Sequence, residues 1–153
     1  MKTIIVMCGC PGSGKSTFVE KLSRDNSNVC VVSRDIIRAE LGFIKEGEKA
    51  VCSKEQENAV TNAWWEKVSS TKADMLIIDD TNTNIKFRED LLWKLRVEFP
   101  SVPKFIFRMV TKLETCKERR IGQVPEEVIE RMWNGMVSLK AEEGYTLINI
   151  KGE

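Results

Sequence analysis

The sequence predicts one α/β domain built around a parallel five-stranded sheet with helices on both faces. Short apolar runs rich in β-branched residues, typical of buried strands, alternate with longer amphipathic stretches typical of helices. This alternation indicates parallel strands joined by helical crossovers, which cover both faces of the sheet. The chain of 153 residues has the length of one ordinary domain, and it contains no internal repeat, low-complexity segment or linker.

The individual elements follow from the same patterns. We expect strands at residues 2–8, 28–33, 73–79, 102–110 and 145–150. We expect helices at residues 15–24, 34–41, 53–70, 86–99, 113–120 and 126–143. The last helix has apolar residues at helical spacing, with Pro125 placed to begin it and Gly144 placed to end it. The tryptophans lie in these helical patterns, where we expect core packing rather than base stacking: Trp64, Trp65, Trp93 and Trp133.

The composition limits the chemistry. The chain has 24 basic and 23 acidic residues, for a formal net charge of +1, so no global field attracts nucleic acid and any polyanion site must be local. It contains no histidine, the commonest general base and metal ligand. Carboxylates must therefore carry out any proton transfer near neutral pH.

The cysteines and the terminal residues indicate a cytoplasmic protein. The five cysteines are odd in number and scattered, which favours a reducing compartment over a disulfide scaffold. The apolar run after Lys2 is too short for a signal peptide, because Gly9 and Pro11 interrupt it. No stretch approaches the roughly 20 apolar residues that cross a bilayer, so we expect no membrane contact.

The segment "GCPGSGKST" matches the phosphate-binding pattern G-x-x-x-x-G-K-[ST], with a strand expected before it and a helix after it. In that context backbone N–H groups and the helix N-terminus converge on phosphates. Lys15 is expected to neutralise the β and γ phosphates of ATP, and Ser16 to supply an oxygen to Mg²⁺. The alternative is a glycine-rich turn with an exposed lysine. The predicted nucleotide-binding residues are Gly9, Cys10, Pro11, Gly12, Ser13, Gly14, Lys15, Ser16 and Thr17.

Two acidic residues follow the third expected strand, in "MLIIDDTNTN". A carboxylate at this place orients Mg²⁺ or its water ligands in many phosphate-loop proteins. Because successive side chains on a strand point to opposite faces, only one of Asp79 and Asp80 is expected to face the phosphate loop. The alternative is that both merely end the strand and cap the next helix.

Asp35 and Arg38 lie three residues apart in "SRDIIRAE", so they share one face of a helix at the carboxyl edge of the sheet. Asp35 is placed to accept the proton of an attacking hydroxyl, and Arg38 to hold an anionic group of the acceptor. The alternative is an N-capping aspartate with a surface ion pair.

Residues 112–124 are expected to form a basic lid. Between residues 104 and 120, basic side chains outnumber acidic ones six to two. Arg119 or Arg120 is expected to reach the transferring phosphoryl group and stabilise its charge. The alternative is a solvated helix face.

Taken together, "GCPGSGKST", "SRDIIR", "DDTN" and "RRIGQVPEEVIERMW" resemble the kinase domain of the phage polynucleotide 5′-hydroxyl kinases, over residues 1 to about 144. The resemblance implies an adenylate-kinase-like fold, a role in nucleic acid repair, and transfer of the ATP γ-phosphate to the 5′-OH of DNA or RNA. It implies that Lys15 and Ser16 bind ATP and Mg²⁺, that Asp35 is the general base, and that Arg38 binds the acceptor's 3′ phosphate. It also favours Asp80 over Asp79 as the acidic residue at the metal.

The sequence departs from this family in two places. The segment between the arginines and V-P is shorter, so Arg119 and Arg120 compete for the lid role. No D-x-D-G-T phosphatase motif is present, so residues 1–153 are expected to form the kinase domain alone. A small-metabolite kinase of gluconate or shikimate type is the main alternative, which the near-neutral charge favours. A regulatory switch that hydrolyses ATP is a third interpretation.

Overall fold

The computed structural model describes residues 1–44 and 52–152, which form one α/β domain. All neighbouring strands are parallel, in the order β2-β3-β1-β4-β5. This confirms the predicted fold class. The elements of the described part are β1 (Thr3–Cys8), α1 (Lys15–Asp25), β2 (Val29–Val32), α2 (Arg34–Glu40), α3 (Lys54–Ser70), β3 (Met75–Ile78), α4 (Ile85–Glu98), β4 (Lys104–Val110), α5 (Leu113–Arg119), α6 (Glu126–Val137) and β5 (Thr146–Lys151).

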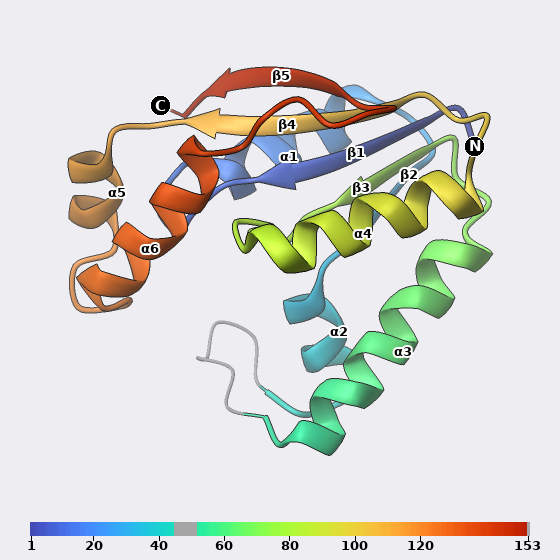
Figure 1. Cartoon of the computed structure of the whole chain (residues 1–153). Coiled ribbons are helices and arrows are strands. Elements are labelled where there is room, and N and C mark those ends of the chain that lie inside the picture. Colours follow the sequence, from blue (N-terminus) through green and yellow to red (C-terminus); the bar gives the residue numbers. More distant parts are fainter. Residues whose placement is uncertain (45–51, 153) are drawn as a thin grey trace.

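The central strand β1 forms the middle of the core. Its apolar residues Ile4, Val6 and Met7 are fully buried, as continuous apolar runs in parallel sheets are when helices cover both faces. Helix α1 lies behind the sheet in Figure 1, while α4 and α6 lie in front of it and α2 and α3 extend from the β2 side.

The register of the sheet gathers the site residues at one edge. Ile78 pairs with Val6 of β1 and with Val32 of β2, so β1, β2 and β3 reach their carboxyl ends side by side. Two loop hydrogen bonds continue this alignment: the N–H of Gly9 donates to the carbonyl of Thr81 over 2.9 Å, and the N–H of Asp79 to that of Val32 over 2.8 Å. Ligands bind at such edges in open α/β sheets.

Most helix bounds agree with the sequence patterns. Helix α3 begins after Ser53, where a capping box fixes its start: the Ser53 side chain accepts from the Gln56 N–H, and the Gln56 side chain accepts from the Ser53 N–H. Helix α4 begins after Asn84, whose side chain accepts the N–H of Phe87 over 3.1 Å.

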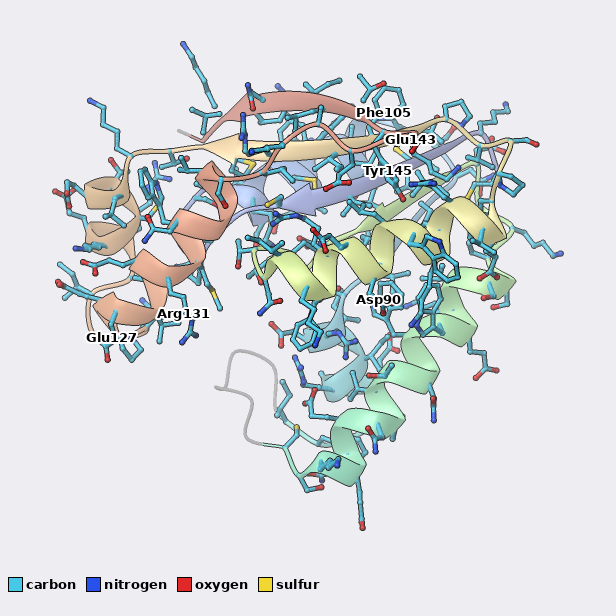
Figure 2. The ribbon with its side chains drawn as sticks, viewed as in Figure 1. Asp90, Phe105, Glu127, Arg131, Glu143 and Tyr145 are labelled. Carbon is cyan, nitrogen blue, oxygen red and sulfur yellow. The ribbon has the colours of Figure 1, made fainter. Side chains whose placement is uncertain are left out.

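The last helix is shorter than predicted, because α6 ends at Val137 and not at residue 143. The guanidinium of Arg108 on β4 donates to the carbonyls of Val137 and Leu139, at 3.3 and 2.9 Å, and so provides partners for carbonyls at the helix end. The chain then turns to bury Leu139. Tyr145, labelled above α4 in Figure 2, donates from its hydroxyl to the carbonyl of Leu92 over 3.0 Å.

The tryptophan prediction is only partly confirmed. Trp64 is buried, whereas Trp93 on the outer side of α4 is 57% exposed, which contradicts its expected core packing. Trp65 and Trp133 are half-buried against the core. In residues 1–44 and 52–152, no helix combines the length and apolar character that a membrane crossing requires.

Gly135 fixes how closely α6 approaches the loop after β3. A Cβ at this position would collide with the backbone carbonyl of Thr83. We therefore expect Gly135→Ala to lower the free energy of unfolding by about 1–3 kcal/mol, although alanine is the better helix former.

Urea unfolding of the purified variants measures this loss. The exposed neighbour Asn134 provides the control, since Asn134→Ala gains helix propensity without a collision. Equal stability of Gly135→Ala and wild type would contradict the close approach of α6.

Candidate active site

The phosphate loop has the backbone that its glycines permit. Gly12 and Gly14 have φ of 81° and 90°, in the left-handed region that favours glycine. A Cβ on Gly12 would also press on the backbone of Cys116 in α5. Gly14 is the N-cap of α1, so the helix N-terminus opens directly into the loop.

A pocket of about 160 Å³ lies over this loop. Residues Cys10 to Thr17 line it, together with Thr81 from the loop after β3 and Arg120 from the segment after α5. Backbone N–H groups at a helix N-terminus and a nearby arginine are a suitable environment for phosphate. The structure thus brings eight of the nine predicted nucleotide-binding residues together around one cavity, and Gly9 directly precedes them.

Lys15 contacts Asp79 rather than Asp80. Its ammonium donates to Asp79 Oδ1 over 2.6 Å, and both side chains are largely buried. Side chains alternate between the two faces of a strand, and only one of the two carboxylates after β3 contacts the phosphate loop. That carboxylate is Asp79, whereas the resemblance favoured Asp80.

Asp80 bonds to the helices α2 and α3. Its Oδ1 accepts the backbone N–H of Arg34, the first residue of α2, over 2.9 Å. Its Oδ2 accepts the indole N–H of Trp64 on α3 over 3.2 Å. Burial raises the pKa of Asp80, and these two hydrogen bonds oppose that rise. Asp80 thereby joins β3 to both α2 and α3.

Asp35 and Arg38 lie together on α2, as their spacing predicted. Arg38 Nη1 donates to Asp35 Oδ1 over 2.7 Å. Arg38 also forms a two-pronged ion pair with Glu57 of α3, with Nε to Oε1 at 2.8 Å and Nη2 to Oε2 at 2.9 Å. Hydrogen bonding to Glu57 raises the pKa of Arg38, and the same bond lowers the pKa of Glu57. The Asp35 side chain is 77% exposed, so its carboxylate is open to an incoming group.

Glu57 was not predicted from the sequence. It lies in the first turn of α3 and belongs to no phosphate-transfer motif, and acidic residues in a first helical turn are ordinary. Its role depends on how α3 packs against α2, which the local pattern does not determine.

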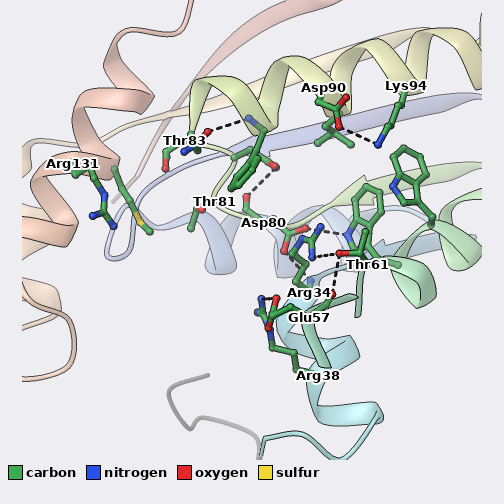
Figure 3. Close-up of a pocket in the computed structure, with 17 residues that line it drawn as sticks. Arg34, Arg38, Glu57, Thr61, Asp80, Thr81, Thr83, Asp90, Lys94 and Arg131 are labelled. Carbon is green, nitrogen blue, oxygen red and sulfur yellow. Dashed lines mark hydrogen bonds and ion pairs between the residues drawn. The ribbon is translucent and has the colours of Figure 1, made fainter. Parts of the chain in front are cut away.

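A larger pocket of about 660 Å³ adjoins the phosphate loop. Figure 3 shows Arg34 and Arg38 of α2 beside Glu57 and Thr61 of α3, with Arg131 of α6 on the opposite side. Thr81 lines both this pocket and the pocket over the phosphate loop, so the two cavities meet at the loop after β3. This volume is typical of a small-molecule site.

The two lid arginines have different surroundings. Arg119 Nη1 donates to the carbonyl of Gly12 over 3.0 Å, so it is bonded to the phosphate loop itself. Arg120 lines the phosphate pocket. Cys116 of α5 also contacts Cys10 of the phosphate loop, with the two sulfurs 3.5 Å apart. Burial raises the pKa of the Cys10 thiol to about 12.

These features define a nucleotide-binding domain of the P-loop kinase fold, which supports a phosphotransferase activity. The chain belongs to the family described as an AAA domain, whose family model matches residues 4–139. Kinases of this fold generally use ATP and Mg²⁺.

Solved structures share the fold. A chain of the Pnkp1/Rnl/Hen1 RNA repair complex has a TM-score of 0.69 and 18% identity, with 89% of this chain and 44% of that chain covered. A gluconokinase from Sinorhizobium meliloti 1021 has a TM-score of 0.59 and 16% identity, covering 97% and 82% of the two chains. The Deinococcus radiodurans tunicamycin resistance protein has a TM-score of 0.62 and 18% identity, covering 97% and 86%. The chain spans less than half the length of the Pnkp1/Rnl/Hen1 chain that it matches.

The ion pair between Arg38 and Glu57 predicts a pH-dependent contribution to stability. Because the pKa of Glu57 is lowered by folding, its contribution is complete above the ordinary glutamate pKa of 4.5 and is lost as the pH falls through the lower folded value. Glu57→Gln should therefore be less stable than wild type at pH 7, by about 1 kcal/mol or less since the pair is partly solvated. The difference should shrink below pH 4.

Urea unfolding of both proteins between pH 3 and pH 7 measures this effect. Glu55→Gln is the matched control, because Glu55 is exposed in the same first turn of α3. A stability difference that stays constant over this pH range would contradict the lowered pKa.

Proposed function

We propose that this chain is an ATP-dependent polynucleotide 5′-hydroxyl kinase, which transfers the γ-phosphate of ATP to 5′-OH ends of DNA or RNA. The observation that carries the proposal is the ion pair between Arg38 and Asp35. Arg38 lines a pocket that meets the phosphate site at Thr81, and it holds the exposed Asp35 carboxylate, which lies outside the pocket lining, over 2.7 Å. A carboxylate next to a guanidinium suits an acceptor that has a hydroxyl close to a phosphate. The resemblance to phage kinases and the fold shared with a chain of an RNA repair complex support it.

Arg38 has capacity for that phosphate. Three of its five N–H groups donate to Asp35 and Glu57. The described residues leave the other two for an acceptor phosphate, while Glu57 holds the guanidinium plane in place. We propose that Asp35 accepts the proton of the attacking 5′-hydroxyl, which raises the nucleophilicity of its oxygen at the moment of transfer.

The donor side would be formed by the phosphate loop. Lys15 and the loop N–H groups would hold the β and γ phosphates, and Arg120 would stabilise charge on the transferring phosphoryl group. Mg²⁺, when bound, supplies positive charge that offsets the charge of the phosphates. Its ligands are typically one or two protein oxygens plus phosphate oxygens, so a hydroxyl and one carboxylate fit. We propose Ser16 with Asp79, because Asp79 contacts Lys15, whereas both oxygens of Asp80 already accept hydrogen bonds.

A small-metabolite kinase is the second candidate. The gluconokinase structure covers a larger share of both chains than the RNA repair structure does, and the net charge is close to zero. In that case Arg38 would bind the carboxylate of a sugar acid, which two N–H groups also match.

Label transfer from γ-labelled ATP with Mg²⁺ tests these alternatives directly. We expect label on a 5′-OH oligonucleotide and none on gluconate or shikimate. Asp35→Asn should lower kcat by roughly 10²-fold or more, because the amide cannot take the hydroxyl proton, while the KM for ATP stays nearly unchanged. Asp25→Asn, an exposed aspartate at the end of α1, is the control.

The outcomes separate the candidate functions. Transfer to gluconate or shikimate with no transfer to the oligonucleotide would establish the metabolite kinase instead. Release of labelled phosphate to water alone would indicate an ATP-hydrolysing switch. Wild-type kcat in Asp35→Asn would remove this residue as the base.

The two lid arginines should respond differently to removal. Arg120→Ala should lower kcat by roughly 10²-fold or more, as expected for an arginine that stabilises the transferring phosphoryl group. Arg119→Ala should mainly weaken ATP binding and stability, because it removes a hydrogen bond to the Gly12 carbonyl.

Steady-state kinetics and thermal unfolding of both variants check this assignment. The lysine variants Arg119→Lys and Arg120→Lys serve as charge-preserving controls. The reverse pattern, in which Arg119→Ala carries the larger loss of kcat, would assign the phosphoryl contact to Arg119.

A further inference from the structure

The large pocket continues past Arg38 toward α4, and this outer part is lined by aromatic side chains. Phe87, Leu91 and Lys94 of α4 contribute to it, together with Trp65 of α3. The whole cavity of about 660 Å³ therefore extends well beyond the guanidinium that would hold a single phosphate. The outer part has no assigned role in the phosphoryl transfer itself.

Phe87 has the most unusual environment of these residues. It lines the pocket although the residue is 75% exposed, so a large apolar ring is left in water. Its backbone is well fixed, because its N–H donates to the Asn84 cap over 3.1 Å. A solvent-facing ring on a fixed backbone gains hydrophobic contact when a flat apolar surface covers it.

Trp65 is less available for stacking than Phe87. The ammonium of Lys94 lies 5.3 Å from the centre of the Trp65 ring, and the Trp64 ring meets it edge to face with centroids 4.9 Å apart. Lys94 is itself paired with Asp90 over 3.0 Å. Trp65 thus forms a wall of the pocket, and Phe87 offers the open ring.

The pocket lining carries both charges, and two of its cations are ion-paired within it: Arg38 with Glu57 and Lys94 with Asp90. In Figure 3 Arg131 of α6 lies on the opposite side of the pocket from the paired Asp90 and Lys94 of α4. Arg131 is exposed and makes no ion pair with the residues that the structure describes. Aromatic rings interleaved with cations are the usual surface for single-stranded nucleic acid.

We propose that Phe87 is the stacking platform for a nucleobase of the acceptor strand and so makes the enzyme select acceptors that carry bases. This inference rests on the proposed function. It assigns the outer pocket to the base, while Asp35 and Arg38 act on the 5′-hydroxyl and the adjoining phosphate. A nucleobase has a π-face whatever its identity, so the preference is for the presence of a base and not for a sequence.

The experiment compares two short 5′-OH oligonucleotides, one intact and one with its first two nucleotides abasic. Wild type should have a KM at least tenfold lower for the intact acceptor, in the range that one stacked base provides. Phe87→Ala should raise the KM for the intact acceptor about tenfold and bring the ratio between the two acceptors close to one. Phe87→Trp should restore the ratio.

Trp93→Ala is the matched control, because Trp93 is an exposed aromatic residue of the same helix and lies outside the pocket lining. It should keep the wild-type ratio. An unchanged ratio in Phe87→Ala, or no discrimination by wild type, would overturn the inference while leaving the 5′-kinase activity established. Failure of wild type to label any 5′-OH acceptor would overturn the proposed function and this inference with it.

Discussion

Two adjacent carboxylates at the end of β3, Asp79 and Asp80, connect the phosphate loop to the start of α2. Because consecutive residues leave a strand in opposite directions, Asp79 reaches Lys15 in the phosphate loop while Asp80 reaches the start of α2 and the indole of Trp64. The helix that carries Asp35 and Arg38 is thus tied to the same short strand that contacts the nucleotide side. Movement of β3 relative to either half would break hydrogen bonds at a buried edge, which is costly.

Residues 112–124, which the sequence predicts to form a lid, consist of α5 and the turn that follows it. Cys116 packs on Gly12 and lies against Cys10, and Arg119 bonds the loop backbone, so α5 is fixed on the phosphate loop. The segment after α5 includes Ile121, which is 75% exposed. Arg120 directly follows this anchored helix, so only a short stretch would need to adjust for it to perform the role we propose. This limits the conformational entropy that such an adjustment costs.

The sequence determined those features that depend on local pattern. Strand runs, the phosphate loop, the pairing of Asp35 with Arg38 and the single carboxylate facing the loop all follow from periodicity and spacing of a few residues. Glu57 and the early end of α6 were missed because each depends on a distant partner: α2 packed on α3 in one case, Arg108 of β4 in the other. The exposure of Trp93 was missed because a helical pattern alone does not say which side of the helix faces the core.

The choice between a polynucleotide and a small metabolite depends on how the acceptor's anion is held. Both a phosphate and a sugar-acid carboxylate satisfy the two N–H groups that Arg38 has left, so the guanidinium alone does not discriminate between them. A metabolite gains most from a closed polar pocket, since its hydroxyl groups must find partners once they leave water. The lining of this pocket has both characters: Phe87 and Arg131 are exposed, whereas Thr61, Asn82 and Thr83 offer polar partners. An exposed ring gains contact only from an acceptor that carries a base, so our proposal of a polymer end depends on that ring.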